Sequence, residues 1–199
     1  VMLAVVLGAS LFPRMRWGDI AEDVVASALY VANWLLASRA VDYLAAEEAA
    51  SPLQHFWSLS LEEQFYLAWP AVLLGAAWIA RAARLHTMSL VRAATVLVIA
   101  ITLAYSVYAT ELRPGYAYFA TTTRAWELAL GALLAMYTGW RTLGETTRAV
   151  AAWAGLLSIA VAMLAFGADT AFPGHAALLP TGGPALVLMS GATFQRWSA

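Results

Sequence analysis

The sequence predicts an all-α protein, a polytopic bundle of transmembrane helices. Of its 199 residues, 62% are hydrophobic and only 12% are charged, whereas soluble domains typically carry about 25% charged residues. The mean hydropathy of +0.71 agrees with this composition. A water-soluble fold would have too few polar side chains to cover its surface, so the lipid bilayer is the expected solvent.

About six spanning segments are expected, because a spanning helix needs about 20 mainly apolar residues. The expected segments are residues 1–12, 65–80, 90–109, 125–140, 149–166 and 176–192. A further apolar run, 24–38, is short and contains Asn33, so we expect a re-entrant helix there. The chain begins inside an apolar run and also ends soon after one. We therefore expect a piece of a larger membrane domain, cut at both ends.

The arginines predict an orientation for these helices. The links richest in arginine are 81–92, 141–148 and the end of the chain at Arg196. Cytoplasmic loops carry an excess of basic residues, so these links are expected inside. The segments expected outside are 38–63, 110–124 and 168–174. The sequence therefore predicts a multi-pass membrane protein, with membrane lipid as its surroundings.

Composition also excludes several kinds of site. The sequence has no cysteine, so disulfides, thiolate nucleophiles and cysteine-ligated zinc are excluded. Its net charge of −1, without clustered basic residues, argues against nucleic acid as a partner. Its three histidines lie on separate segments, without the spacing of metal ligands. We therefore expect neither a metal nor a nucleic-acid partner.

The first group of chemically capable residues lies at 55–70, HFWSLSLEEQFYLAWP. Charge at a membrane boundary is costly, so an ionisable cluster there indicates function. In a helix, His55, Glu62 and Tyr66 fall near one face. Glu62 paired with His55 could remove the proton of a sugar hydroxyl, and a partly desolvated Glu62 or Glu63 could act as the acid. The expected substrate-binding residues are Trp57, Ser58, Ser60, Gln64 and Tyr66.

A structural interpretation of the same residues stays open. Ser60 and Glu63 have the spacing of a capping box, in which each satisfies an exposed amide of the other. Both glutamates would also lie at the positive end of a helix dipole. His55 would then be a hydrogen-bonded surface residue, and the aromatic side chains would be interfacial anchors.

The second group surrounds Arg124. Arg124 and Glu127 are three residues apart and can pair on one helix face. Arg124 could instead bind a phosphate, a carboxylate or one of the upstream glutamates. Tyr118 is a candidate transient acyl carrier through its phenolic oxygen, or else an interfacial anchor. Gly131 and Ala135 form a small-residue step that would let another helix approach closely.

Three blocks together resemble one known family. Residues 55–70, RAWELALGALLA at 124–135 and FPGHAALLPTGGPAL at 172–186 resemble the acyltransferase 3 family in sequence and in order. The pair Asn33-Trp34 also fits. The resemblance implies transfer of an acyl group, commonly acetyl from acetyl-CoA, to hydroxyls of lipopolysaccharide, peptidoglycan or other envelope carbohydrate. The acyl group would have to cross the membrane.

The sequence departs from that family at its start. Members begin with two further helices, which carry an arginine and a histidine usually assigned to catalysis, and these are not present here. We therefore expect this piece to be inactive alone, with His55, Glu62, Glu63 and Arg124 completing a site built elsewhere. Two other functions stay open: a transporter or flippase subunit for an envelope precursor, and helices with a purely structural role.

Overall fold

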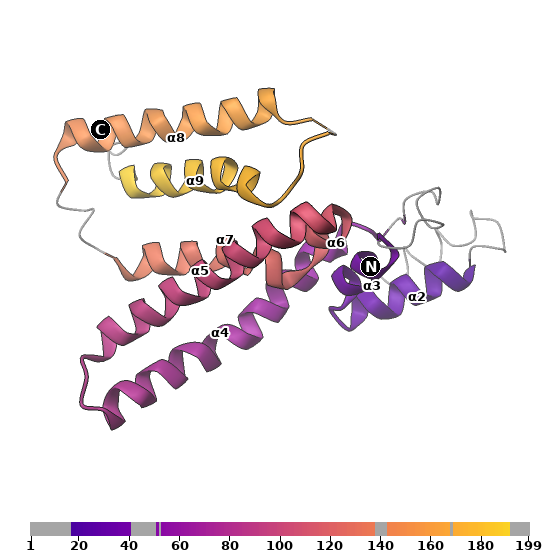
Figure 1. Cartoon of the computed structure of the whole chain (residues 1–199), viewed down its shortest axis with the longest axis horizontal. Coiled ribbons are helices and arrows are strands. Elements are labelled where there is room, and N and C mark those ends of the chain that lie inside the picture. Colours follow the sequence, from indigo (N-terminus) through magenta and orange to yellow (C-terminus); the bar gives the residue numbers. More distant parts are fainter. Residues whose placement is uncertain (1–16, 41–50, 52, 138–142, 168, 192–199) are drawn as a thin grey trace, which may run out of the picture.

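A computed structural model describes residues 17–40, 51, 53–137, 143–167 and 169–191 (Figure 1). These residues form helices and connecting turns, without a strand, so the all-α prediction is confirmed for this part of the chain. The helices are α2 (Trp17–Ala28), α3 (Ala32–Arg39), α4 (Phe56–Ala82), α5 (Thr87–Leu112), α6 (Pro114–Phe119), α7 (Thr121–Met136), α8 (Glu145–Ala165), η4 (His175–Ala177) and α9 (Leu178–Ser190).

Three of these helices, α4, α5 and α8, are long and apolar enough to cross a membrane. α4 and α5 contain the expected segments 65–80 and 90–109, and α8 covers the expected segment 149–166 except for its last residue. Large apolar side chains point away from the protein on these helices; Leu67 is 83% and Leu164 is 88% exposed. Water would make this surface unfavourable, whereas lipid tails solvate it.

The other expected spans are not confirmed. α7 and α9 have 16 and 13 residues, fewer than the roughly 20 that a spanning helix needs, and they were expected as the segments 125–140 and 176–192. The segment 1–12 lies outside the described residues, as do parts of these two. The run 24–38 is divided between α2 and α3 by a turn in which Tyr30 has a φ of 55°. A re-entrant path needs such a break, but the path itself stays a prediction.

The helices alternate in direction, as the arginine pattern predicts. α5 and α7 lie side by side. α8 and α9 form a second pair, and α9 of this pair packs against α7 (Figure 1). At one end of the bundle, Thr121 donates to Gln64 (2.6 Å) and the Gly174 amide donates to Thr110 (3.0 Å). We call this the aromatic end, because Trp57 of α4 and the rings of Tyr118 and Phe119 of α6 lie together there.

Arginines occupy the opposite end. Arg92 of α5 donates to the carbonyl of Met136 (2.6 Å), in the last turn of α7. Arg148 of α8 donates to the carbonyl of Ser190 (3.3 Å), in the last turn of α9. The carbonyls at a helix C-terminus lack intrahelical partners and carry partial negative charge. The same arginines that predict orientation therefore also cap the neighbouring helices.

Close helix approach occurs at glycines other than the predicted one. A Cβ on Gly155 of α8 would lie 2.6 Å from the carbonyl oxygen of Gly183, and a Cβ on Gly183 would lie 2.8 Å from Ile159. Gly131 is exposed, and a Cβ there would meet nothing within 4 Å. The prediction that Gly131 and Ala135 admit a neighbouring helix is therefore wrong for the described residues, because both residues face away from the helices packed on α7.

This difference predicts opposite effects of one substitution at two helical glycines. Gly155→Ala should lower the free energy of unfolding by about 1–3 kcal/mol, because the new methyl group overpacks the contact between α8 and α9. Gly131→Ala should leave stability unchanged or raise it by less than about 1 kcal/mol through helix propensity. Denaturant unfolding in detergent micelles measures both. Equal effects of the two variants would contradict the glycine contact.

Candidate functional site

A hydrogen-bonded network centred on Gln64 organises the aromatic end. The Gln64 amide nitrogen donates to the Tyr30 carbonyl (2.7 Å) and to Asn33 Oδ1 (2.9 Å). Its oxygen accepts from Trp34 Nε1 (2.9 Å) and from Thr121 Oγ1 (2.6 Å). A side-chain amide offers two donors and two acceptor positions, so the hydrogen-bonding capacity of Gln64 is filled. Gln64, a predicted substrate-binding residue, thus joins α3, α4 and α7.

Asn33 completes the network from within the protein. Its amide nitrogen donates to the Phe119 carbonyl (3.2 Å) and to Thr121 Oγ1 (2.9 Å). Asn33 is fully buried, where an unpaired amide would be costly. From the sequence, Asn33 is a reason against a spanning helix and part of the Asn33-Trp34 pair, but its partners are not predictable because they lie 86 and 88 positions away. The one signal in the sequence is that Asn33 and Trp34 place two hydrogen-bonding side chains next to each other in an apolar run.

The beginning of α4 differs from the predicted capping box. The helix begins at Phe56, with His55 at the N-cap position. Ser60 is therefore inside the helix and buried, and its hydroxyl donates to the Phe56 carbonyl (2.9 Å). Ser58 is exposed and donates to the His55 carbonyl (3.3 Å). The capping box of Ser60 and Glu63 is therefore wrong, because the whole block 56–70 is already helical.

The predicted pairing of His55 with Glu62 is also wrong. Seven residues of α-helix separate their positions by about 10 Å along the axis, and no hydrogen bond or ion pair joins them. The exposed His55 ring instead contacts Phe56, with the ring centroids 4.7 Å apart. Glu62 is half-buried, and within the described residues its carboxylate has no hydrogen-bond or ion-pair partner. Glu63 and Tyr66 are exposed.

Arg124 has the ion pair that its spacing predicts. Its Nε lies 2.8 Å from Glu127 Oε1, and its Nη2 donates to Glu127 Oε2 (3.1 Å). Its guanidinium carbon lies 5.6, 5.9 and 5.1 Å from the ring centroids of Trp57, Tyr118 and Phe172. Aromatic ring faces attract a cation at these distances. Arg124 makes no ion pair with Glu62 or Glu63 in the described structure, so that alternative is wrong here.

The three rings around Arg124 also contact one another. The ring centroids of Trp57 and Tyr118 lie 5.2 Å apart, and those of Tyr118 and Phe172 lie 6.1 Å apart. We call these three residues the aromatic wall. Trp57 belongs to α4, Tyr118 to α6, and Phe172 to the segment between α8 and α9. That segment is fixed by Gly174, which has a φ of 36° and whose Cβ would lie 3.2 Å from Thr110.

An open pocket lies beside the aromatic wall. Its volume is about 610 Å³, within the range of small-molecule sites. Its side-chain lining consists of Pro114, Tyr118 and Phe119 from α6, and Phe166, Thr170 and Phe172 from the segment after α8. Of the predicted site residues, only Tyr118 lines it. No single stretch of sequence indicates this pocket, because residues about 50 positions apart form it together.

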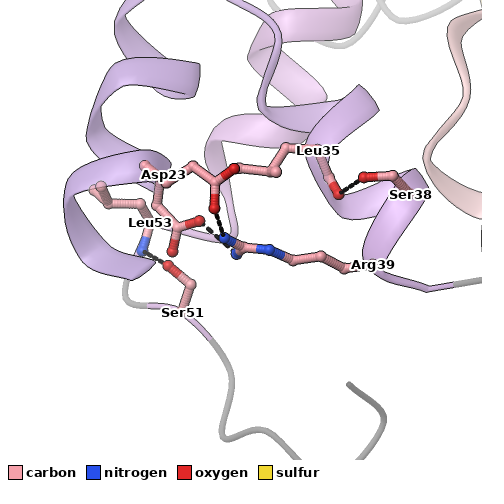
Figure 2. A network of polar contacts seen from close by, with 7 residues as sticks. Asp23, Leu35, Ser38, Arg39, Ser51 and Leu53 are labelled. Atoms are coloured by element: carbon pink, nitrogen blue, oxygen red, sulfur yellow. Dashed lines mark hydrogen bonds and ion pairs between the residues drawn. The ribbon is translucent and has the colours of Figure 1, made fainter. Parts of the chain in front are cut away.

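Ion pairs with α2 hold α3 in place (Figure 2). Arg39 donates to Asp23 (2.6 Å) and to Glu22 (2.7 Å), and Asp23 is only 6% exposed. Burial acts to lower the pKa of Arg39, but its hydrogen bonds to the two carboxylates outweigh burial and raise that pKa. This ion pair keeps the turn at Tyr30 and the residue Asn33 at the α4 helix.

No metal centre accompanies these groups in the described part of the chain. There, no three side chains of histidine, aspartate or glutamate lie together in a way that could hold a metal ion. His86 accepts from the Ser89 amide (3.4 Å) at the beginning of α5, and His175 is exposed in the turn before α9. The three histidines therefore stand at the beginnings of three different helices, His55 at α4, His86 at α5 and His175 at η4.

Comparison with known proteins relates the chain to bacterial O-acetyltransferases. Peptidoglycan O-acetyltransferase OatA of Listeria monocytogenes is 33% identical over 165 residues, which are 80% of this chain and 26% of that protein. YrhL of Bacillus subtilis is 31% identical over 138 residues, 68% of this chain and 21% of that protein. O-acetyltransferase OatA of Staphylococcus aureus is 48% identical over 52 residues, 26% of this chain and 8% of that protein.

No family model matches the chain, and no solved structure matches it. The chain spans 26% of the length of the Listeria protein and less of the other two. The similarity therefore supports the coarser part of the resemblance, a relationship to O-acetyltransferases. The acyltransferase 3 assignment, and the residues carried over from it, stay predictions.

The network predicts a structural role for Gln64. Gln64→Leu keeps the side-chain size but leaves Asn33, Trp34 and Thr121 with unpaired polar atoms, so stability should fall by about 3 kcal/mol or more. Glu63→Gln, at the exposed neighbouring position, should change stability by less than about 0.5 kcal/mol. Unfolding in detergent micelles measures both. Wild-type stability of Gln64→Leu, with weakened substrate binding, would instead favour the original binding role.

Proposed function

We propose that this chain is part of a membrane-embedded O-acetyltransferase that acetylates a hydroxyl of cell-wall carbohydrate. The observation that carries this proposal is its 33% identity over 165 residues to a protein named peptidoglycan O-acetyltransferase. The geometry of the aromatic end is compatible with it, because a half-buried carboxylate, an aromatic pocket and a paired arginine lie there together.

Glu62 is the residue proposed for proton transfer. A general base needs a carboxylate that is not already neutralised by an internal cation. Glu62 meets this condition among the described residues, whereas Glu127 is paired with Arg124. In the reaction, the sugar oxygen forms a bond to the acetyl carbon and its proton passes to the base, while the bond between the acetyl carbon and its donor breaks. His55, exposed at the N-cap of α4, is the second candidate for this proton transfer.

Arg124 is proposed as a positioning residue. Both oxygens of Glu127 already face its guanidinium, and three rings surround it. Little of its charge is left to bind an anionic substrate, but the same contacts hold Trp57 and Tyr118 in place. Tyr118, which is partly exposed and lines the pocket, keeps its proposed role as a transient acyl carrier.

The proposed orientation places the aromatic end outside the bacterial inner membrane. The opposite end, which carries Arg92 and Arg148, lies in the cytoplasm. This follows the excess of arginine in the links 81–92 and 141–148. Acetyl-CoA, the proposed donor, would then arrive at one end of the bundle and the carbohydrate acceptor at the other. The acetyl group would therefore cross the membrane between the helices, together with any segments that complete the site.

The first test replaces the proposed base. In the complete gene product, Glu62→Gln should abolish acetylation of envelope glycan without preventing membrane insertion, because an amide cannot accept the proton. Glu111→Gln, an exposed glutamate near the end of α5, is the matched control and should retain activity. Acetate released by mild base from purified glycan is the measurement. Wild-type acetate in the Glu62→Gln strain would show that Glu62 is not the base.

The second test separates charge from geometry at Arg124. Arg124→Ala should lower acetylation at least tenfold, about 1.4 kcal/mol in the transition-state free energy. Arg124→Lys keeps the charge but loses the paired contacts and much of the ring coverage, so it should also impair the reaction, mainly through a higher KM for the acceptor. Arg113→Ala, at an exposed position, serves as control. Full activity of Arg124→Lys would overturn the positioning role.

A further inference from the structure

One side of the pocket beside the aromatic wall is formed by α6, and the other by a segment after α8 whose backbone is not helical. α8 ends at Ala165, and the described residues among 166–174 form no regular helix; there the Gly167 amide donates to the Thr170 hydroxyl (3.0 Å). Irregular backbone facing lipid is not tolerated within the hydrocarbon of a bilayer. The pocket therefore opens at the level of the interface or the water, and a ligand reaches it from that side and not from among the lipid tails.

The lining of the pocket selects against charged ligands. Its walls are the rings of Tyr118, Phe119, Phe166 and Phe172, with the Thr170 hydroxyl as a polar group, and no charged residue lines it in the described structure. Arg124 contacts two of these rings, those of Tyr118 and Phe172, but it does not line the pocket and is paired with Glu127. A phosphate-bearing ligand such as a coenzyme A moiety would lose hydration here without gaining a cation.

A neutral sugar ring has the complementary chemistry. A pyranose presents a flat face of C–H groups, and its hydroxyl groups lie around the edge. The flat face can stack on an aromatic ring while the edge remains in water or bonds to a hydroxyl such as that of Thr170. Aromatic side chains supply contact area of this kind with little loss of conformational freedom. The flat rings and the absence of charge thus favour a neutral carbohydrate.

The pocket is also continuous with the helix that carries the proposed base. The aromatic wall leads from Phe172 through Tyr118 to Trp57, with ring centroids 6.1 and 5.2 Å apart. Trp57 belongs to the first turns of α4, as does Glu62. A glycan strand held in the pocket can therefore extend along the wall toward α4.

We propose that this pocket is an acceptor subsite that holds one neutral sugar ring of a glycan strand by stacking on Phe166 and Phe172. This inference rests on the proposed function, because it names where the acceptor binds. Phe166, Thr170 and Phe172 then have a role in acceptor binding. The ring of Tyr118 belongs both to the aromatic wall and to the lining of the pocket.

The experiment uses Phe166, which lines the pocket and is not one of the three rings around Arg124. In the complete gene product, Phe166→Leu keeps an apolar side chain but removes the flat ring. We expect a KM for a soluble peptidoglycan tetrasaccharide at least fivefold higher, with kcat changed less than twofold. Phe166→Tyr restores the ring and should restore KM. Trp153→Leu, an exposed aromatic residue of α8, is the matched control and should leave KM unchanged.

Binding of the same tetrasaccharide without any acetyl donor, followed by calorimetry, gives a readout independent of turnover. Weakened binding in Phe166→Leu and recovery in Phe166→Tyr support the subsite. Unchanged KM and unchanged binding in Phe166→Leu, with an active wild-type enzyme, would overturn the subsite and leave the proposed function standing. A wild-type protein that binds the tetrasaccharide but never acetylates it would instead refute the proposed function and keep the subsite.

Discussion

The four hydrogen bonds of Gln64 are the interaction on which the rest of the aromatic end depends. Four groups from α3, from the turn before it and from α7 meet one amide of α4, and Asn33 extends the same network to α6. Asn33 is fully buried, and leaving a buried polar group unpaired is costly. The network therefore fixes where α4 and α7 begin relative to one another, and this places Trp57 beside Tyr118 and Arg124.

This arrangement gives the charged residues two different roles. The ion pair between Arg124 and Glu127 neutralises both partners, and the rings of the aromatic wall cover them. Glu62 lies on the adjacent helix without such a partner in the described structure. A paired, covered charge can hold geometry, whereas proton transfer needs a carboxylate that is free to accept a proton. The two groups are thus suited to different tasks within one site.

Local features were predictable, and several attractive patterns were not reliable. The pairing of Arg124 with Glu127 depends only on helical spacing, and it is confirmed. The predicted capping box at Ser60 is wrong because α4 begins at Phe56, four residues before Ser60. A capping box needs its serine at the N-cap position, outside the helix. The pairing of His55 with Glu62 failed because residues on one helix face seven positions apart are still two turns apart.

The sequence by itself determined the helical class, the three long apolar helices and the local ion pair, because composition and short-range spacing suffice for these. Only the tertiary structure decided that Gln64 is an internal link, since its partner Thr121 is 57 positions away. The tertiary structure also decided that the close contact between helices forms at Gly155 and Gly183 and not at Gly131. The pocket depends on α6 meeting the segment after α8, and such meetings between distant segments are set by packing and buried polar satisfaction, which no local pattern encodes.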